Sequence, residues 1–535
     1  MGISNSSTGP TQSVGSTKVN LFFAILLIAM TIYFLWWGLD YTMRQQTTLF
    51  IIATAFGVFM AFNIGGNDVA NSFGTSVGAG TLTIPQALGI AAIFEVSGAV
   101  LAGGEVTDTI RSGIVDLDGL SVEPNQFIYV MLSALFAAAF WLLFATKKGL
   151  PVSTTHAIIG GVVGSSIVLG ITLGGTEMAL STVSWSKIGT IAISWVLSPL
   201  LGGVLSYLLY GQIKKNIIEY NDRTEAHIAE LKANKKVLKQ NHKEFLDGLT
   251  ESEQLAYTSA MLRDQEIYKD DDCLVEDLET DYYKELYKLE NERSNLDTLK
   301  ALKQWVPIIA AAGGAVMASL VIFKGLKNVN NGMTTLQGFL IMGMIAALVW
   351  LATYIYTKSI RGKHKEDLTK ATFIMFSWMQ VFTASAFAFS HGSNDIANAV
   401  GPFAAIMDVI RTNSISTEAA VPPAVMLTFG VALIVGLWFI GKEVIQTVGT
   451  NLAKMHPASG FSAELAAAAV VMGASTMGLP VSSTHTLVGA VLGIGMVNKD
   501  TNWALMKPIG LAWVITLPVA AGLSAISYIV LSNIF

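Results

Sequence analysis

The sequence predicts an all-α, polytopic transmembrane helical bundle, and three observations support that prediction. Of the 535 residues, 52% are hydrophobic and only 13% are charged, whereas soluble domains carry roughly 25% charged residues. The apolar residues form long uninterrupted runs. The charges instead gather in one segment, 211–303, which holds 36 of the 71 Lys, Arg, Asp and Glu residues. An ordinary soluble enzyme is therefore excluded, and the net charge of −5 offers no case for nucleic-acid binding.

The apolar runs are long enough for helices that cross a membrane. Most have 17–25 residues, and a helix needs about 20 to cross a hydrocarbon core of ~30 Å. Because every backbone N–H and C=O group needs a partner in lipid, helix-length runs indicate a bundle rather than a barrel. We expect about 12–13 spans, from the runs at 20–38, 48–64, 84–103, 125–146, 152–173, 185–210, 305–323, 335–357, 372–391, 420–441, 463–478, 481–497 and 505–534.

The chain divides into four parts by composition. An N-terminal tail with a candidate extra helix occupies 1–45, a first repeat 46–210, a charged insertion 211–303 and a second repeat 304–535. The insertion mixes Glu, Lys, Leu and Ala at three- and four-residue steps, which is typical of solvated helices. It is either a solvated helical hairpin or a regulatory or partner-binding domain, and nothing in it specifies a ligand.

The placement of Lys and Arg predicts the orientation in the membrane. The insertion and the Lys-rich loop 358–370 are separated by two spans, so they lie on one side, which we expect to be the cytoplasm. The acid-rich loop 104–124 falls on the opposite side. We expect an integral membrane protein, in the plasma membrane. The single cysteine, Cys273, allows no intramolecular disulfide.

Two short motifs each occur twice. Gly65–Asn71 (GGNDVAN) returns as Gly392–Asn398 (GSNDIAN) 327 positions later, and Gly149–His156 (GLPVSTTH) returns as Gly478–His485 (GLPVSSTH) 329 positions later. Two matches in the same order and at nearly the same spacing indicate an internal duplication. Counting spans outward from the insertion gives the two copies opposite directions of entry. We therefore expect inverted repeats with broken helices and re-entrant half-helices, an architecture that places a transport site at the bilayer midplane.

The first motif carries candidate cation ligands. Glycines interrupt an apolar run, and an Asn-Asp pair follows at once. A carboxylate inside a membrane segment is costly, so Asp68 and Asp395 are candidates for cation or proton coupling. The alternative is a helix kink whose capping residue happens to be charged. Carboxylate and amide oxygens suit Na⁺, whereas a carboxylate could instead carry the coupled proton. The cation candidates are Asn67, Asp68, Asn394 and Asp395, with Asn71, Asn398, Gly65, Gly66 and Gly392 in supporting positions.

The second motif carries a candidate anion site. Gly-Leu-Pro ends one helix, and proline suits the first turn of the next. Hydroxyl residues then lie where the new helix exposes free N–H groups, and together these can hold a tetrahedral oxyanion. Plain helix capping by Ser153 and Ser482 is the alternative, but two copies favour an anion site. The anion candidates are Ser153, Thr154, Thr155, Ser482, Ser483 and Thr484.

Two histidines and two further acidic residues also lie in or beside apolar runs. His156 and His485 follow the serines by three residues, and a Ser–His pair suggests the alternative of an intramembrane hydrolase. The motif has no third orienting group, so helix packing or a hydrogen bond to a backbone carbonyl is the favoured role of these histidines, and we expect no enzyme. Glu95 lies inside an apolar run and is a further cation candidate. Glu464 lies near a predicted helix start, where the helix dipole alone favours an acid. No Gly-x-x-x-x-Gly-Lys-Ser/Thr motif is present, so we do not expect ATP to drive transport.

The two repeated motifs resemble those of the inorganic phosphate transporter (PiT) family, over about 45–210 and 305–534. The resemblance implies a secondary transporter for inorganic phosphate, with inverted repeats and often dimeric. It ties the carboxylates of Asp68 and Asp395 to cation-coupled transport, and it singles out Ser153 and Ser482. Acidic residues in Phe-Glu and Ser-Gly-Phe-x-x-Glu-Leu contexts are also used in the family, and Glu95 and Glu464 match them.

The coupling ion is implied only by the form of the first motif. Asn-Asp-Val-Ala-Asn-Ser-Phe-Gly at 67–74 looks more like the sodium-coupled branch than the proton-coupled bacterial one. The rivals are a proton- or metal-phosphate symporter, a sulfate carrier on the same scaffold and a passive anion channel. Expected partners are inorganic phosphate, Na⁺ or H⁺, membrane lipid and a second copy of the chain, with no organic cofactor. The run at 20–38 precedes the usual first helix of the family, so an extra span is expected there.

Overall fold

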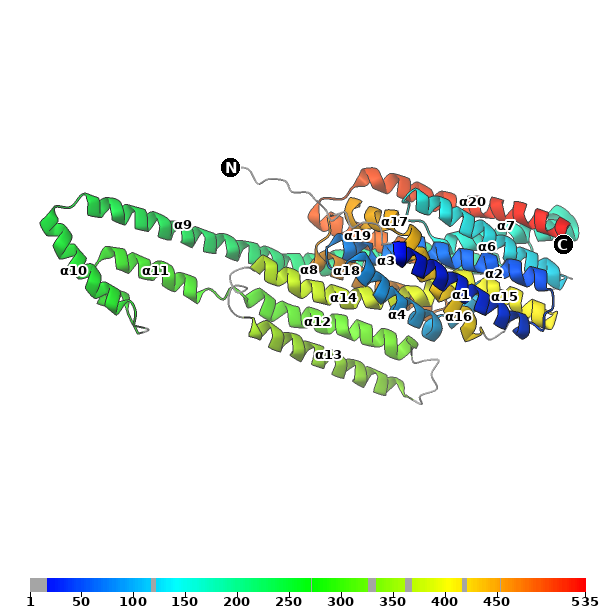
Figure 1. The fold of residues 1–535 in the computed structure, drawn as a ribbon, viewed down its shortest axis with the longest axis horizontal. Helices are drawn as coiled ribbons and strands as arrows, with labels where there is room; N and C mark the ends of the chain where they lie inside the picture. Colours follow the sequence, from blue (N-terminus) through cyan, green and yellow to red (C-terminus); the bar gives the residue numbers. More distant parts are fainter. Residues whose placement is uncertain are drawn as a thin grey trace. The chain divides into compact units, whose positions relative to one another are not determined.

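The chain folds into helices along almost its whole described length (Figure 1). The computed structural model describes residues 17–116, 122–270, 272–325, 333–360, 368–415, 421–452 and 454–535. Within these ranges no β-strand forms, and Val115 and Val183 make one isolated antiparallel bridge. The Asn71 side chain, a supporting residue in the sequence prediction, lies outside the described part.

Twelve helices or continuous helical stretches of the described residues are long and apolar enough to cross a membrane. This confirms the prediction of an all-α, polytopic membrane bundle. The run at 20–38 lies in the first of the twelve, α1 (Thr17–Tyr41).

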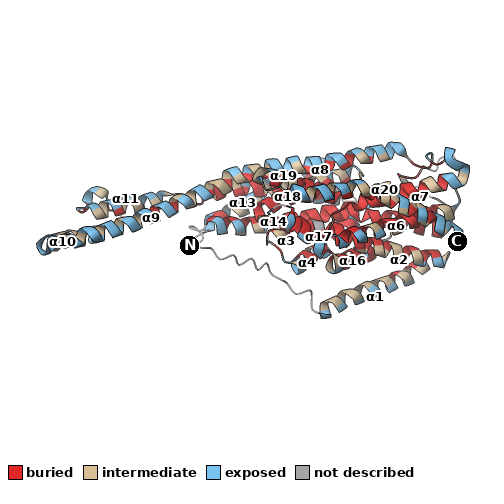
Figure 2. Ribbon diagram, turned by 90° about the horizontal axis from the view of Figure 1, so that it is seen from above, coloured by how far each residue is buried: buried red, intermediate tan, exposed pale blue. Residues whose placement is uncertain are grey.

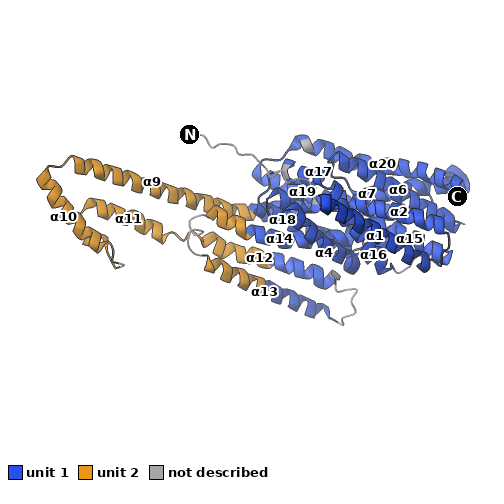
Figure 3. Cartoon of the chain, viewed as in Figure 1, with its two compact units in different colours: residues 1–211, 312–346, 376–535 blue, residues 212–311, 347–375 orange. Residues whose placement is uncertain are grey.

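The described residues form two compact units, drawn in different colours in Figure 3. Unit 1 comprises 1–211, 312–346 and 376–535, and unit 2 comprises 212–311 and 347–375. The helices within or mainly within unit 1, besides α1, are α2 (Thr47–Ile64), η1 (Gly65–Val69), α3 (Ala70–Gly78), α4 (Ile84–Ala102), α5 (Gly104–Ser112), α6 (Pro124–Lys147), α7 (Thr154–Gly174), η2 (Gly175–Glu177), α8 (Trp185–Ile213), α15 (Ala397–Thr412), α16 (Pro423–Ile440), α17 (Lys442–Gln446), η7 (Thr447–Asn451), α18 (Pro457–Thr476), α19 (Ser483–Asn498) and α20 (Trp503–Ile534).

The remaining helices belong to unit 2 or run through both units. Those of unit 2 are η3 (Lys214–Ile218), α9 (Glu219–Asp247), α10 (Glu251–Ile267), η4 (Val275–Asp277) and α11 (Asp281–Asn295). Those that have residues in both units, or join such helices, are α12 (Lys300–Leu320), η5 (Val321–Gly325), α13 (Thr335–Ser359) and α14 (Leu368–Asp395).

An aromatic cluster joins four helices in the core of unit 1. Phe34 of α1, Phe50 of α2, Phe403 of α15 and Phe429 of α16 are all fully buried. The Phe34 and Phe403 ring centroids are 5.7 Å apart, and those of Phe403 and Phe429 are 4.9 Å apart. Figure 2 shows buried residues concentrated on inner helices such as α6, whereas α1 is mainly exposed along its outer face. Trp36 of α1 is 71% exposed, as expected for an apolar side chain of a helix that faces lipid.

The first motif interrupts two helices without unwinding them. In the first copy α2 passes through a π-helical turn, η1, into α3; in the second, α14 ends at Asp395 and α15 begins at Ala397. The residues before α3 and α15 keep helical backbone angles, and no side chain caps either helix. Neither carboxylate therefore caps a helix, so the capping role given as the alternative is not seen at Asp68 or Asp395. Single π-helical turns are frequent at functional sites.

The second motif reverses the chain at a glycine in each copy. Gly149 has φ 65° and Gly478 has φ 66°, a left-handed conformation that glycine adopts without steric cost. The turn joins α6 to α7 in the first copy and α18 to α19 in the second. As a result, α7 begins at Thr154 and α19 begins at Ser483, each directly after a Pro-Val-Ser segment.

The insertion of unit 2 is helical, as its sequence predicts. Buried apolar side chains of α9 (Leu231) and α11 (Leu286) contribute its small core, and Lys235 pairs with Glu290 across the same two helices. Near the end of α10, the buried Asp264 carboxylate accepts hydrogen bonds from the backbone N–H groups of residues 279 and 280, which fixes the approach to α11.

Candidate functional site

Two helix N-termini form the frame of the candidate site. The Ser153 hydroxyl oxygen accepts a hydrogen bond from the backbone N–H of His156 at 3.1 Å, and Ser482 accepts the same bond from His485 at 3.1 Å. Both serines are therefore N-caps, of α7 and α19, as the alternative reading of these two residues held. The two turns also touch directly, because the Thr155 hydroxyl donates to the Val481 carbonyl at 3.0 Å.

Asp68 connects the two helix N-termini. The Thr484 hydroxyl, from α19, donates to Asp68 Oδ1 at 2.8 Å. The Thr154 hydroxyl, from α7, donates to the other oxygen, Asp68 Oδ2. The carboxylate is 1% exposed, so it is buried between hydroxyl groups of both motif copies. Residues 86 and 416 positions away from Asp68 thus meet on one carboxylate.

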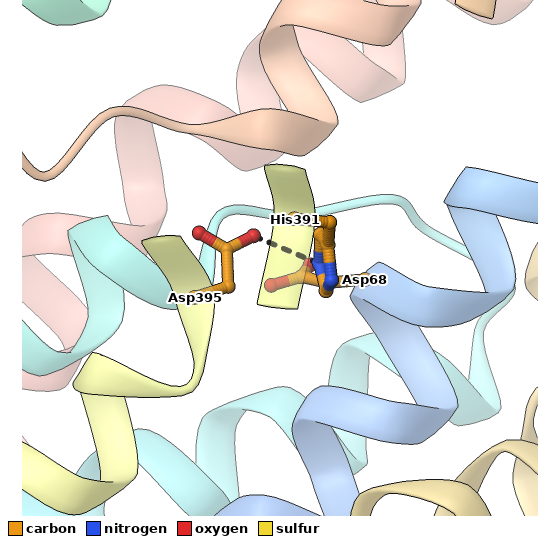
Figure 4. A group of neighbouring side chains, drawn as sticks. All are labelled: Asp68, His391 and Asp395. Atoms are coloured by element: carbon orange, nitrogen blue, oxygen red, sulfur yellow. Dashed lines mark ion pairs between the residues drawn. The ribbon is translucent and has the colours of Figure 1, made fainter. Parts of the chain in front are cut away.

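Asp395 has different neighbours from Asp68. The Ser483 hydroxyl of α19 donates to Asp395 Oδ2, and the same oxygen lies 2.8 Å from Nε2 of His391. His391 Nδ1 in turn lies 2.7 Å from Glu95 Oε2 on α4. In Figure 4 a dashed line joins His391 to Asp395, and Asp68 belongs to the same group of side chains. His391, Glu95 and both aspartates are all buried, so a cluster of three acids and one imidazole lies in the apolar core of unit 1.

Sequence reasoning missed His391. It precedes the second copy of the motif directly, but its counterpart 327 positions earlier is Ile64, so the repeat gives no signal for it. The sequence feature that could have indicated His391 is its position inside an apolar run, three residues before an Asn-Asp pair.

Several buried oxygens of the cluster have no hydrogen-bond partner among the described residues. These are Asp395 Oδ1, Glu95 Oε1, Asn394 Oδ1 and Asn398 Oδ1. Buried polar atoms are nearly always partnered, so these oxygens are candidate ligand positions. In addition, one ligand atom each from Asp68, His391 and Asp395 lies within 4.8 Å of the other two. The donor set, mostly oxygen, fits a hard cation.

The asparagine that precedes the aspartate in each motif copy hydrogen-bonds the proline turn of the same copy. Asn67 Nδ2 donates to the Leu150 carbonyl at 3.0 Å, and its Oδ1 accepts from the Val152 N–H at 3.1 Å. Asn394 Nδ2 donates to the Leu479 carbonyl at 3.2 Å. The amide nitrogens therefore hold the second motif against the first in each copy. The amide oxygen of Asn67 is already engaged, whereas that of Asn394 has no hydrogen-bond partner among the described residues.

Asn398 reaches the candidate anion site. Its Nδ2 lies 3.0 Å from the Thr154 hydroxyl and 3.2 Å from the Thr155 hydroxyl, both on α7. It contributes a polar donor from α15 to a site that otherwise consists of hydroxyl groups and backbone N–H groups. The glycines Gly65 and Gly392 support the site differently: each permits close backbone approach of a neighbouring helix, at Leu433 O and Glu95 O.

Glu464 forms a separate polar cluster in unit 1. Its Oε1 accepts hydrogen bonds from Thr75 at 2.7 Å, from Ser76 and from Gln380 at 3.1 Å, and its Oε2 accepts from Thr383 at 2.9 Å. The four donors are uncharged, and the carboxylate is fully buried. The site residues predicted from sequence therefore fall into two groups, one around Asp68 and Asp395 and one around Glu464.

The histidines of the second motif pack against aromatic rings. The His156 ring centroid lies 3.9 Å from that of Trp195, and the His485 ring centroid lies 3.8 Å from that of Trp513. Ser153 and Ser482 use their hydroxyl oxygens to accept backbone N–H groups instead of contacting an activating base. The arrangement is that of packed helix ends.

The chain is similar to known proteins of phosphate transport. The model of a family described as the phosphate transporter family matches residues 64–524. A Mycobacterium bovis protein described as a candidate phosphate permease is 58% identical over 517 residues, covering 96% of this chain and 93% of the relative. A Haemophilus influenzae protein with the same description is 34% identical over 491 residues, covering 90% of this chain and 97% of the relative.

A solved structure agrees in fold. It is described as the sodium-dependent phosphate transporter, matches with a TM-score of 0.68 and 29% identity, and covers 91% of this chain and 100% of its own. The resemblance that the repeated motifs indicate is thereby confirmed. The chain belongs to the phosphate transporter family, and it is a membrane transporter and not an enzyme.

Proposed function

We propose that the protein is a secondary active symporter that carries inorganic phosphate together with Na⁺ across the plasma membrane by alternating access. Membership of the phosphate transporter family supports the substrate, and the sodium-dependent description of the structural relative supports the ion. The observation that carries the proposal is the hydrogen bonding of the Asp68 carboxylate. Its buried carboxylate accepts hydroxyl hydrogen bonds from the N-terminal turns of both α7 and α19, so cation and anion groups share one site.

Phosphate binds between the two helix N-termini in this proposal. The first turn of each helix offers free backbone N–H groups and the positive end of the helix dipole. Ser153 and Ser482 cap these turns, while Thr154, Thr155, Ser483 and Thr484 supply hydroxyl donors and Asn398 an amide donor. The donors are neutral, so the anion is held without a permanent ion pair and can be released.

The coupling cation binds at the acidic cluster. Asp68 and Asp395 supply carboxylate oxygens, and the unpartnered oxygens of Asp395, Glu95 and Asn394 are the open ligand positions. Three buried acids against one imidazole leave a negative site, which in an apolar interior requires a positive partner. At a separation of ~4 Å, attraction between opposite charges is several-fold stronger there than in water, so the cation also supports the phosphate charge. Glu464, with its hydroxyl donors, is a second candidate cation position.

Shared hydroxyl groups give the coupling a physical cause. The hydroxyls of Thr154 and Thr484 donate to Asp68, and that of Ser483 donates to Asp395. A hydroxyl has one hydrogen, so while it donates to a carboxylate it cannot donate to phosphate. A cation that binds the carboxylates takes over their charge compensation and frees the hydroxyls for the anion. We infer that the cation binds first and phosphate second.

One observation favours a different coupling ion. His391 places an imidazole nitrogen within 2.8 Å of Asp395, and imidazole is a ligand for transition metals and a carrier of protons. A proton- or metal-phosphate symporter is therefore the second candidate function. A sulfate carrier or passive channel has no comparable support from the described residues.

The matching turns and contacts of the two motif copies support an inverted duplication, with alternating access through the movement of one repeat against the other. The insertion 211–303 then lies in the cytoplasm, as the placement of Lys and Arg predicts. Limited proteolysis of right-side-out and inside-out vesicles tests this: cleavage within 219–295 is expected only when the cytoplasmic face is accessible. We also expect a homodimer, and light scattering of the purified protein in detergent measures its mass.

Uptake of labelled phosphate by proteoliposomes tests the proposal. An inward Na⁺ gradient is expected to drive accumulation above equilibrium, and an equal K⁺ gradient is not. Uptake that ignores Na⁺ but follows a pH gradient, or that needs a divalent cation, would replace Na⁺ by the second candidate. Flux without uphill accumulation under any gradient would reduce the protein to a channel.

A further inference from the structure

Four aromatic rings lie in a row beside the helix N-termini, and the proposed mechanism does not use them. The ring centroids of Trp195 and His156 are 3.9 Å apart, those of His156 and His485 are 4.6 Å apart, and those of His485 and Trp513 are 3.8 Å apart. The two histidines meet edge to face. The row therefore begins on α8, crosses the first turns of α7 and α19, and ends on α20.

Each tryptophan holds the proline of the opposite motif copy. Trp195 of α8 donates its indole N–H to the Pro480 carbonyl at 3.1 Å, and Trp513 of α20 donates to the Pro151 carbonyl at 3.1 Å. Pro480 precedes α19, and Pro151 precedes α7. Each indole thus packs against the histidine of its own half of the chain, tilted at Trp195 and stacked at Trp513, and hydrogen-bonds the turn of the other half.

The same crossed pattern continues one helical turn away. A Cβ atom on Gly489 of α19 would lie 2.3 Å from the Pro199 carbonyl oxygen of α8, and one on Gly160 of α7 would lie 2.6 Å from the Leu517 carbonyl oxygen of α20. Such close backbone contact is available only to glycine and locks the helices in register. On α8 the carbonyl that meets the glycine (Pro199) lies four residues after the tryptophan. The same spacing separates Leu517 from Trp513 on α20. We call each pair of contacts, one indole bond to a proline carbonyl and one glycine contact four residues along the same helix, a clamp. The two clamps are equivalent, and each joins one half of the chain to the other.

We propose that Trp195 and Trp513 are positioning residues that fix the distance between the two helix N-termini and so set the size of the anion site. The inference rests on the proposed function. Each clamped carbonyl lies two residues before a capping serine, Ser153 or Ser482, so a shift of the proline moves the hydroxyl and N–H donors with it. One further direct bond, from Thr155 to Val481, joins the same turns.

A site of fixed width discriminates between oxyanions of different size. Phosphate and arsenate have the same shape and charge, but arsenic–oxygen bonds are longer. A rigid cradle favours the smaller ion because its donors cannot follow the larger one, whereas a loosened cradle accepts both. The clamps therefore determine the preference for phosphate over arsenate more than the speed of transport.

Replacing each indole by a ring without N–H tests the proposal. Trp195→Phe and Trp513→Phe keep an aromatic ring against the histidine but remove the bond to proline. In proteoliposomes each variant is expected to raise KM for phosphate about five- to tenfold, the effect of one lost hydrogen bond, with Vmax within about twofold. Inhibition of phosphate uptake by arsenate is expected to strengthen by a similar factor.

Trp141→Phe is the matched control. Its indole N–H also bonds between helices, from α6 to the Thr516 hydroxyl of α20 at 2.9 Å, but its acceptor is a threonine side chain and not the carbonyl of a motif proline. KM and the arsenate response are expected to stay at wild-type values. A change in Vmax alone in the Trp195 and Trp513 variants, or equal changes in all three variants, would overturn the positioning role.

A distance measurement separates this inference from the proposed function. Spin labels at Ile171→Cys on α7 and Met496→Cys on α19, both exposed, in a Cys273→Ser background report the separation of the two helices without reference to phosphate. The distribution is expected to broaden in the Trp195 and Trp513 variants and to stay narrow in Trp141→Phe. An unchanged distribution refutes the clamp even if transport is confirmed. Absence of phosphate uptake in the wild type refutes the proposed function alone.

Discussion

Asp68 and Asp395 occupy equivalent places in the two motif copies, yet their surroundings differ. Hydroxyl groups from both helix N-termini surround Asp68, whereas Asp395 shares a buried imidazole with Glu95. The asymmetry comes from one position, because His391 corresponds to Ile64 in the first copy. The two carboxylates therefore contribute to cation binding in different ways, although the sequence repeat makes them look alike.

Neutralising either carboxylate is expected to abolish coupled transport. Asp68→Asn and Asp395→Asn keep the size of the side chain but remove the charge that the cation compensates. We expect Na⁺-driven phosphate uptake to fall by about 100-fold or more, the upper end of typical coupling energies. Asp40→Asn, at the exposed end of α1, is the control and should behave as wild type. Normal membrane insertion with wild-type uptake in the first two variants would remove both residues from the mechanism.

The shared hydroxyl groups make a second prediction. Thr484→Val keeps the shape of the side chain but removes the hydroxyl that donates to Asp68. We expect the apparent affinity for phosphate to fall about five- to tenfold, the scale of one hydrogen bond. In Thr428→Val the lost hydroxyl bonded only the Ala424 carbonyl of its own helix, so phosphate affinity should not change. Equal effects in the two variants would mean that the Thr484 hydroxyl has no special place in the site.

At the scale of the helix, the two turns before α7 and α19 depend on a backbone conformation that only glycine adopts freely. Gly149→Ala and Gly478→Ala each force a Cβ into the left-handed region, which costs about 1–2 kcal/mol per residue. We expect a lower Tm for both variants in thermal unfolding of the purified protein in detergent. Gly343→Ala, in the exposed middle of α13, has no atom within 4 Å of the added Cβ and is expected to leave Tm unchanged or raise it.

The insertion contains one turn whose stability depends on pH. Burial raises the pKa of Asp264, but hydrogen bonds from the Glu279 and Thr280 N–H groups and the Thr280 hydroxyl outweigh burial, so its pKa lies below the ordinary value. A carboxylate with a lowered folded pKa stabilises the fold fully above its unfolded pKa, about 3.9, and this contribution is lost as pH falls below that value. The connection between α10 and α11 should therefore loosen on acidification below about pH 4.

Hydrogen exchange in the intact protein checks this expectation. Peptides that cover 274–283 are expected to lose protection in the acid range in the wild type. In Asp264→Asn they should exchange faster at neutral pH and show a smaller further change on acidification. Asp272→Asn, an exposed acid in the same stretch, is the control and should retain the wild-type profile. Protection that is independent of pH in the wild type would contradict the role of Asp264.

For the whole molecule, cation and phosphate should stabilise one another. If the cation frees hydroxyl groups for the anion, each ligand binds more tightly in the presence of the other. A ligand at 100 times its Kd stabilises the folded protein by about 2.7 kcal/mol. We expect phosphate to raise Tm little in K⁺ buffer and clearly in Na⁺ buffer. The same rise in both buffers would contradict cation-first binding.

The sequence predicted the class of the fold and the two motifs because both are local properties of the chain. Apolar runs of helix length require a bundle in lipid, and a duplicated Asn-Asp or Pro-Val-Ser segment is visible without coordinates. The partners of these residues were not visible. Glu464 receives its hydrogen bonds from α3 and α14, far away in the chain, and Trp195 meets a proline 285 positions later. Only the packing of helices decides which distant polar groups meet.

Phe34 has a consequence for anyone who shortens this chain. The region that matches the family begins at residue 64, so α1 lies outside it and could be taken as dispensable. Yet its phenylalanine ring is wedged among Phe50, Phe403 and Phe429. A truncated protein that starts near residue 45 would lose this ring and expose the Phe50, Phe403 and Phe429 side chains that it covers. Expression tags and fusion partners therefore belong ahead of α1, and never in its place.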